Sequence, residues 1–262
     1  MQLSSLDIYY FVKEFQNIEG AIVSNIFQPS DLIFALHKEG KNYLYVGSNH
    51  IYLSNQKASQ AEPTPFVMSL RKRLNRARLI SVDQIGFERI LILRFQNHED
   101  DFNLYIELFT NGNVVLTDGN NEIIIVKNSE RFKDRDLKKG INYEFPPEKI
   151  DSTRIKLKEF TKIMRSEARS TALKILAIEL GLGGKYATEL CKIVGIKSSL
   201  EKPTEDESRD IYLEFKKLFE RDIIPNVGMQ VNPFIMVTDP PEKSFKTFNE
   251  AIRYFVDLTT PN

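Results

Sequence analysis

The sequence is poor in residues that cross-link chains or bind metals. Its 262 residues include one cysteine, Cys191, three histidines and no tryptophan. A single cysteine excludes a disulfide within the chain and a zinc site built from several thiolates, so a reducing compartment is expected. The sequence therefore predicts a cytoplasmic protein whose core forms without covalent cross-links.

Long hydrophobic runs are also missing. The longest apolar clusters, Ile90–Leu93 and Ile123–Val126, fall far short of the roughly 20 residues that span a bilayer. The amino terminus lacks a secretory pattern, because Asp7 stands where the apolar run of a signal peptide would lie. These absences predict a soluble protein with no membrane partner.

Neither sign of charge is in excess. Lys and Arg number 36, Asp and Glu number 36, and the formal net charge is zero. This balance argues against a uniformly basic nucleic-acid-binding protein. It does not exclude a local basic stripe, because recognition depends on how charge is distributed over the surface.

The sequence has strand patterns before Pro146 and helical patterns after Pro147. Short runs rich in β-branched and aromatic residues alternate with turns of Gly and Asn, which favours antiparallel pairing. The predicted strands are 20–27, 31–37, 42–46, 51–54, 79–84, 89–95, 102–108, 113–117 and 122–126. Two helices, 4–15 and 65–77, are expected to cover faces of this sheet.

The second part of the chain is predicted to be mainly helical. The expected helices are 157–164, 170–180, 183–194, 204–221 and 249–258, with extended pieces at 229–231 and 234–237. The predicted fold class is therefore α+β, with a β-rich domain at 1–146 and a helical domain at 147–262.

Patterns typical of catalysis are scarce. The histidines show no metal-ligand spacing, and neither G-x-S-x-G nor a Walker loop occurs. Cys191 lies among apolar residues of a predicted helix and is interpreted as a buried packing residue. The acidic run 99–101 is interpreted as a solvated connection between strands. No metal, cofactor or small-molecule substrate is indicated.

The first local signal is the segment Arg71–Arg78, which holds five cations and no acid. If the apolar residues of the predicted helix face the core, Arg71 and Arg78 project from the opposite side. Arg73 and Arg76 then flank the apolar stripe. A phosphate-contacting face and a merely solvated face that caps the helix dipole both fit this pattern. The candidate phosphate contacts are Arg71, Lys72, Arg73, Arg76 and Arg78.

The second signal is a glycine-rich turn, Leu180–Ala187, between two predicted helices. Glycine permits a positive φ and a close approach by a nucleic-acid backbone, and amides at the start of the next helix can hold a phosphate. An ordinary helix C-cap explains Gly181 equally well. The turn residues concerned are Gly181, Gly183, Gly184 and Lys185.

A third signal consists of isolated charges. Glu88 and Arg89 lie in a short segment between two predicted strands, and Asp7 lies near the amino terminus. Taken alone, such residues are typical of turns and surfaces.

In combination these motifs resemble the NFACT family, and the resemblance covers nearly the whole chain. The matching residues, in order, are Leu6-Asp7, Phe66, Leu70-Arg71-Lys72, Leu74, Gly86-Phe87-Glu88-Arg89, Glu107-Leu108, Gly112-Asn113, Leu116, Asp118 and Leu182-Gly183-Gly184-Lys185-Tyr186-Ala187. The last turn looks most like that of archaeal members.

The resemblance implies a fold. The family has an N-terminal domain similar to that of formamidopyrimidine-DNA glycosylase, followed by a helix-hairpin-helix domain, a coiled coil and a C-terminal RNA-binding domain. The last two are not in this sequence, so the chain is expected to be an N-terminal fragment.

The resemblance also implies a function in ribosome quality control. Family members bind the large ribosomal subunit that retains peptidyl-tRNA, and they recruit tRNA so that the stalled chain gains a C-terminal tail of alanine, or of alanine with threonine. The ribosome forms the peptide bonds, so the factor is expected to be a tRNA-binding protein and not an enzyme. The family's functional Asp and Asp-Arg pair fall on Asp7 and on Glu88-Arg89, where Glu replaces Asp.

Two other functions compete with this one. A DNA-repair enzyme of the glycosylase fold would begin with a nucleophilic proline, whereas this chain begins Met1-Gln2-Leu3. A surface adhesion module would fit the older name of the bacterial members, fibronectin-binding proteins, but no signal or anchoring motif supports it.

Overall fold

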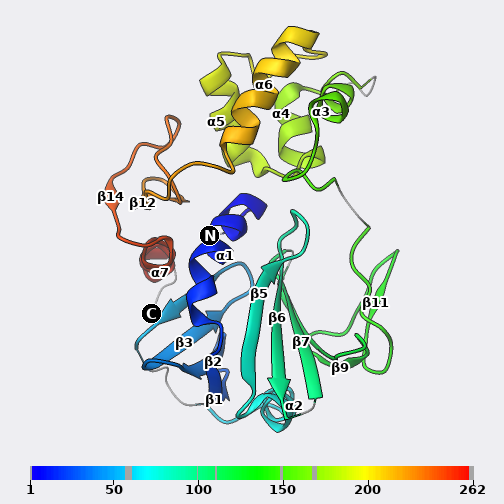
Figure 1. The fold of residues 1–262 in the computed structure, drawn as a ribbon, viewed down its shortest axis with the longest axis vertical. Coiled ribbons are helices and arrows are strands. Elements are labelled where there is room, and N and C mark those ends of the chain that lie inside the picture. The colour runs from blue at the N-terminus through cyan, green and yellow to red at the C-terminus, as the bar shows by residue number, and fades with distance from the viewer. Residues whose placement is uncertain are drawn as a thin grey trace.

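The sheet and most of the helices occupy separate parts of the molecule. In this computed structural model the described residues are 2–56, 61–98, 100–109, 111–147, 150–166 and 170–259. Figure 1 shows a large sheet in the lower part, a group of helices above it, and the last helix lying beside the sheet. The α+β class is thus confirmed as a mixed fold built on a large antiparallel sheet.

Nine antiparallel strands form the large sheet, and each corresponds to a strand predicted from the sequence. Their order is β4-β3-β2-β1-β5-β6-β7-β8-β9, so two meanders meet at β1 and β5. The strands are β1 (Ile22–Phe27), β2 (Leu32–His37), β3 (Lys41–Val46), β4 (Ile51–Ser54), β5 (Arg78–Gln84), β6 (Ile90–Asn97), β7 (Asp100–Glu107), β8 (Asn113–Asp118) and β9 (Ile123–Val126). The expected loop at 99–101 is wrong for Asp100 and Asp101, which begin β7; Glu99 lies outside the described residues.

Helix α1 (Ser5–Phe15) runs along the sheet, and its upper end lies just below the group of helices (Figure 1). It begins near its predicted start because Ser4 and Asp7 form a capping box that satisfies amides of the first turn. Several of its apolar side chains, including Leu6 and Phe11, are fully buried in the core. The helix therefore carries its first turn to the junction between the two parts of the molecule.

Helix α2 (Pro65–Leu74) is shorter than the predicted helix 65–77. The chain leaves the helix because it pairs with Val23 of β1. The Arg76 N–H donates to Val23 O at 2.8 Å, and the Val23 N–H donates to Ala77 O at 2.9 Å. Arg76 has a φ of 68°, and Arg78 begins β5. The expected helical stripe of five cations is therefore wrong, since pairing with the sheet outweighs local helix propensity here.

The helical unit lies above the sheet in Figure 1. Its elements are α3 (Leu157–Met164), α4 (Ala172–Lys174), a π-helical turn (Ile175–Glu179), α5 (Gly183–Val194) and α6 (Glu205–Lys217). The predicted helix 170–180 is thus divided between α4 and the π-helical turn. Phe160 of α3 packs on Phe215 of α6 with ring centroids 5.1 Å apart, and Cys191 is buried as predicted.

Residues 218–259, called the return segment, bring the chain back from the helical unit to the sheet. The segment contains β12 (Asn226–Val227), β13 (Val231–Asn232), β14 (Lys243–Ser244) and α7 (Phe248–Thr259). The extended piece predicted at 234–237 forms no strand. The reason is that the Glu189 carboxylate of α5 accepts the Val237 and Thr238 amides, each at 2.8 Å, in place of a strand partner.

Helix α7 is anchored to both α1 and the outer strand β4. The Glu14 carboxylate accepts from the Phe248 and Asn249 amides at 2.7 and 3.0 Å and so caps α7. The Asn249 side chain accepts from the Leu53 N–H at 2.6 Å and donates to Leu53 O at 3.0 Å. It therefore takes the place of a neighbouring strand at the edge of the sheet.

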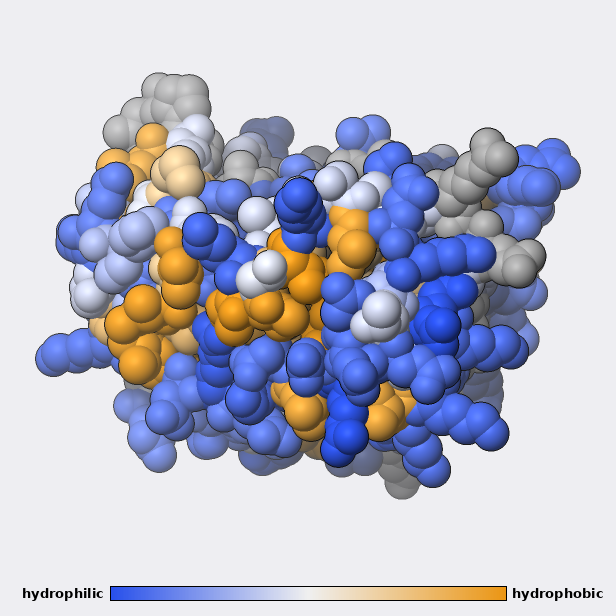
Figure 2. Space-filling view, turned by 90° about the horizontal axis from the view of Figure 1, so that it is seen from above, coloured by the Kyte–Doolittle hydropathy of each residue, from blue (hydrophilic) through white to orange (hydrophobic). Residues whose placement is uncertain are grey.

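The upper end of the molecule carries both apolar and hydrophilic side chains. Figure 2 looks down on this end and shows apolar side chains gathered near the middle with hydrophilic side chains around them. Exposed apolar residues of the helical unit include Leu157, Ile178 and Leu213. Among the helices of the described ranges, none combines the length and the apolar character that crossing a bilayer requires.

We expect Asn249→Ala to destabilise the protein by about 1 to 3 kcal/mol, because two hydrogen bonds to the backbone of β4 are lost. Urea denaturation measures the change. The matched control is Asn17→Ala at an exposed position of the turn that follows α1, which should change the free energy of unfolding by less than about 0.5 kcal/mol. Equal effects of the two substitutions would show that Asn249 does not anchor α7.

Candidate functional site

A cleft of about 750 Å³ lies where α1, the turn between β5 and β6, and the start of α5 meet. It is lined by residues that the sequence analysis selected from three distant segments. These are Asp7, Glu88, Arg89, Gly181, Gly183, Gly184 and Lys185. The fold therefore brings the acidic and arginine motif together with the glycine-rich turn.

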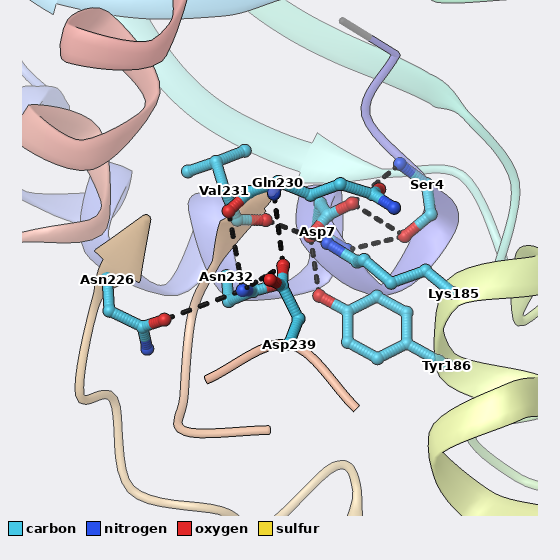
Figure 3. A network of polar contacts seen from close by, with 9 residues as sticks. All are labelled: Ser4, Asp7, Lys185, Tyr186, Asn226, Gln230, Val231, Asn232 and Asp239. Carbon is cyan, nitrogen blue, oxygen red and sulfur yellow. Dashed lines mark hydrogen bonds and ion pairs between the residues drawn. The ribbon is translucent and has the colours of Figure 1, made fainter. Parts of the chain in front are cut away.

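Asp7 is buried, with 1% of its surface exposed. One carboxylate oxygen accepts from Lys185 Nζ at 2.8 Å and from the Tyr186 hydroxyl at 2.5 Å. The other accepts from the backbone N–H and the hydroxyl of Ser4, both at 2.8 Å. Figure 3 shows these contacts converging on one side chain. Four donors fill the acceptor capacity of a carboxylate, so Asp7 holds α1 against α5.

Tyr186 takes part in this network as a donor. Burial, reinforced by the adjacent Asp7 carboxylate, raises the pKa of Tyr186 well above its usual value. The hydroxyl therefore keeps its proton at physiological pH and donates it to Asp7.

Lys185 connects the network to the return segment. Besides Asp7, its ammonium group donates to Val231 O at 2.8 Å, and only 10% of the side chain is exposed. The ammonium group also lies over the Tyr186 ring, 4.4 Å from its centroid. Lys185 is thus mainly an internal cation, although it lines the cleft as the sequence suggested.

A second carboxylate holds the loop that presents Val231. Asp239 accepts from the Met229 and Gln230 amides at 2.7 and 3.0 Å and from the Asn232 side chain at 2.9 Å. Figure 3 shows this group beside the Asp7 network. The loop is therefore held by several hydrogen bonds, and Gln230 is positioned on the wall of the cleft.

Arg89 lies at the end of the tight turn between β5 and β6. The turn is tied to α1, because the Gln84 side chain donates to Ser5 O at 2.9 Å and to Glu88 O at 2.8 Å. Burial lowers the pKa of Arg89, and the neighbouring Glu88 carboxylate opposes that shift, so the guanidinium remains protonated. Within the described residues, no hydrogen bond or ion pair to this guanidinium is found.

The glycine-rich turn presents the amino-terminal end of α5 to the cleft. Gly181 and Gly183 have φ values of 68° and 76°, a region that other residues adopt only with strain. A Cβ atom at Gly183 would lie 3.6 Å from Cβ of Ser4, so the turn also packs closely on the start of α1. The first turn of α5 has no side-chain cap within the described residues. Its amides and the positive end of the helix dipole are suited to an anion.

One part of the cleft wall was not predicted from the sequence. This wall includes Phe109 and Phe132 together with Arg135, which lies in the hairpin formed by β10 (Glu130–Arg131) and β11 (Asp136–Leu137). The two phenylalanine rings are partly buried, and the Arg135 guanidinium lies over the Phe132 ring at 5.0 Å from its centroid. Aromatic rings that remain accessible can stack on planar ligands. No local pattern distinguishes them from ordinary core residues.

Arg135 is held in place by a buried ion pair. Its guanidinium makes two hydrogen bonds to Glu107, at 2.7 and 2.9 Å, and the Tyr143 hydroxyl donates to the same carboxylate at 2.7 Å. The side chains of Arg135 and Glu107 are 3% and 2% exposed. Arg135 lies in a stretch of alternating charges that is typical of a solvated loop, so its burial could not be recognised from the sequence.

The basic segment 71–78 does not belong to the cleft. Arg78 pairs in register with Gln96, whereas Gln84 pairs with Leu91, so the segment and the Glu88-Arg89 turn lie at opposite ends of the β5–β6 hairpin. Three of its cations are engaged with nearby oxygens: Arg71 donates to Ile26 O at 2.8 Å, Arg73 to Ser69 O at 3.3 Å and Arg78 to Gly20 O at 3.1 Å. These cations and the carboxylates that line the cleft therefore do not form one site.

Comparison with known proteins gives a consistent result. A family model described as NFACT N-terminal and middle domains matches residues 4–259. The chain is 25% identical over 287 aligned residues to the archaeal Rqc2 homolog aRqcH of Methanocaldococcus jannaschii, covering 99% of this chain and 43% of that protein. It is 30% identical over 155 residues to the ribosome quality control complex subunit NEMF of Mus musculus, covering 57% of this chain and 14% of that protein. The chain thus spans less than half the length of these relatives.

A solved structure shares the fold. The N-terminal part of the fibronectin/fibrinogen-binding protein of Streptococcus suis superposes with a TM-score of 0.81 at 18% sequence identity. The match covers 98% of this chain and 100% of that structure. At this identity the likeness concerns the fold alone.

We expect Asp7→Ala to destabilise the protein by about 3 to 5 kcal/mol, because it leaves the Lys185 ammonium buried without its counter-ion. Urea denaturation gives the free energy of unfolding. Replacing Lys185 by Met in the Asp7→Ala background should recover part of the loss, since no unpaired buried charge remains.

The control for this prediction is Asp83→Ala, which removes the partner of Arg94 in an ion pair whose side chains are 45% and 48% exposed. Exposed pairs contribute about 0 to 1 kcal/mol. A loss at Asp7 no larger than that at Asp83 would contradict the role of Asp7 in joining α1 to α5.

Proposed function

The chain belongs to the NFACT family, and we propose that it acts in ribosome-associated quality control by binding RNA in the cleft. The relative from Mus musculus is named as a subunit of the ribosome quality control complex, which supports this role. The RNA we propose is tRNA, because the cleft combines groups for phosphates with aromatic rings for unpaired bases.

The proposal rests mainly on the Arg89 guanidinium. A protonated, partly buried guanidinium that makes no hydrogen bond or ion pair within the described residues lines a cleft that also receives the amino-terminal end of α5. A phosphate oxygen would accept hydrogen bonds from both groups. Arginine suits this task because its planar fork donates two hydrogen bonds to one phosphate.

The aromatic wall supports RNA over other polyanions. Stacking on an aromatic ring contributes about 1 to 3 kcal/mol per base in single-stranded nucleic acids. Phe109 and Phe132 offer such surfaces beside the phosphate-binding groups. Single-stranded loops are where proteins usually recognise RNA bases, and tRNA presents such loops on a folded body.

The three residues indicated by the resemblance take different roles in this proposal. Arg89 contacts RNA phosphate. Glu88 lies beside Arg89 and favours its charged form. Asp7 does not contact RNA, because its carboxylate is buried and fully hydrogen-bonded; it positions α5 and Lys185.

The proposal extends to the ribosome. The chain recruits tRNA to a large ribosomal subunit that retains peptidyl-tRNA, in the cytoplasm, and the ribosome itself adds the alanine-type tail. The protein is therefore a binding factor and not an enzyme. DNA-glycosylase activity and surface adhesion remain alternatives, but no feature of the cleft favours either of them.

We also propose a finer description of the fold. The sheet unit, residues 1–146, is similar to the N-terminal domain of formamidopyrimidine-DNA glycosylase, and residues 147–262 form a helix-hairpin-helix domain with the return segment. The glycine turn before α5 and its uncapped amides support the second assignment.

We expect Arg89→Ala to weaken tRNA binding by about 1 to 3 kcal/mol, the usual contribution of an arginine contact to nucleic acid. Filter binding with a labelled tRNA mixture at several salt concentrations measures the affinity, and the salt dependence should become less steep as one phosphate contact is lost.

Arg94→Ala provides the control, because Arg94 lies on the same strand β6, is exposed and does not line the cleft. Its tRNA affinity should match that of the unaltered protein. An Arg89→Ala protein that binds tRNA as tightly as this control would remove Arg89 from the binding site.

A further inference from the structure

A second charged surface lies outside the cleft, on α3 and the residues that flank it. The stretch from Arg154 to Arg165 contains five cations and one acid, Glu159, and the side chains of all six are exposed. The five cations, called the α3 stripe, are Arg154, Lys156, Lys158, Lys162 and Arg165.

The α3 stripe faces solvent because the opposite side of the helix is in the core. Phe160 and Met164 are fully buried, and the Phe160 ring packs on α6. Lys158, Lys162 and Arg165 follow one another at intervals of four and three residues. This spacing places them on one side of a helix.

The lysines of the stripe are not neutralised by the protein itself. Arg165 pairs with Glu205 at 2.7 Å and Arg154 with Asp151 at 3.5 Å. By contrast, the ammonium groups of Lys156, Lys158 and Lys162 make no hydrogen bond or ion pair within the described part of the chain. The basic segment 71–78 differs, since most of its arginines already donate to neighbouring oxygens.

We propose that the α3 stripe contacts the phosphate backbone of ribosomal RNA in the large subunit, while the cleft holds tRNA. This inference rests on the proposed function, because it assigns a surface to the ribosome. Charge complementarity supports it: a row of lysines at the surface suits the negative backbone of an RNA duplex.

The composition of the stripe favours a duplex over an unpaired RNA loop. The stretch 154–165 exposes no aromatic ring on which a base could stack: its single aromatic residue is the buried Phe160. Double-stranded RNA is recognised mostly through its shape, its phosphates and its 2′-hydroxyls, which require only the kind of cations found here. The α3 stripe also shares no residue with the cleft, so substitutions can alter the two surfaces separately.

The test is Lys158→Ala with Lys162→Ala in the 262-residue chain, compared with a matched pair, Lys138→Ala with Lys139→Ala. All four lysines are exposed, and the two variants lose the same charge. Co-sedimentation with purified large ribosomal subunits at several salt concentrations measures one affinity, and filter binding with a labelled tRNA mixture measures the other.

We expect the α3 variant to lose tenfold or more in affinity for the subunit, with a salt slope smaller by about 2, and to bind tRNA like the control. Subunit binding equal to that of the control variant would overturn the proposal. So would an equal loss for tRNA and subunit, because the stripe would then not be a separate ribosomal contact.

A third measurement tests whether the protein binds vesicles that contain phosphatidylserine. If they bind the unaltered protein through Lys158 and Lys162 while subunit binding does not depend on these lysines, the stripe recognises lipid and the proposal is wrong. If the proposed role of the cleft in tRNA binding is wrong, Arg89→Ala will not weaken tRNA binding. Subunit binding will still depend on Lys158 and Lys162, so the two proposals fail in different ways.

Discussion

The carboxylate of Asp7 lies buried at the point where α1, α5 and the return segment meet, and the shape of the cleft depends on it. It accepts from Lys185 and Tyr186 on α5 and from Ser4 at the start of α1. A buried ion pair contributes little to stability compared with a well-packed apolar group, but breaking one is costly. Such a network is therefore suited to specifying one arrangement of two elements. Here it sets where the amides of α5 stand relative to the Glu88-Arg89 turn.

The return segment makes that arrangement rigid. The Tyr10 hydroxyl of α1 donates to Leu218 O at 2.6 Å, Val231 accepts from Lys185, and Asn249 completes the edge of β4. Each contact joins residues that are far apart in the chain. The helical unit is thus attached to the sheet by the covalent connection at Pro146-Pro147, by the return segment and by the Asp7 network, and the cleft lies between these attachments.

The cationic side chains available to a ligand are those that do not already pair with groups of the protein itself. Lys185 and Arg135 line the cleft but are held by Asp7 and Glu107, and the arginines of segment 71–78 donate largely to backbone oxygens. Arg89 and the lysines of α3 have no such partner in the described residues. The cleft is lined by Glu88 and Asp134 as well as by Arg89, so in this chain of zero net charge the α3 stripe, and not the cleft, is predominantly cationic.

Local pattern by itself determined most of the elements. Alternation of apolar residues, turns of Gly and Asn, and caps such as Ser4 act within a few residues, so the nine strands and the helices α1, α3 and α5 were predicted with small errors at their ends. The same local motifs indicated the family and selected Asp7, Glu88, Arg89 and the glycine turn.

Only the tertiary structure decided what those residues contact. Asp7 and Lys185 are separated by 178 positions in the chain, and no periodicity relates them. Helix α2 ends at Leu74 because Val23 pairs with the residues that follow, and Arg135 is buried because Glu107 lies opposite it. These outcomes depend on hydrogen bonds and ion pairs between distant segments, whose energies exceed the local preferences that a sequence pattern expresses.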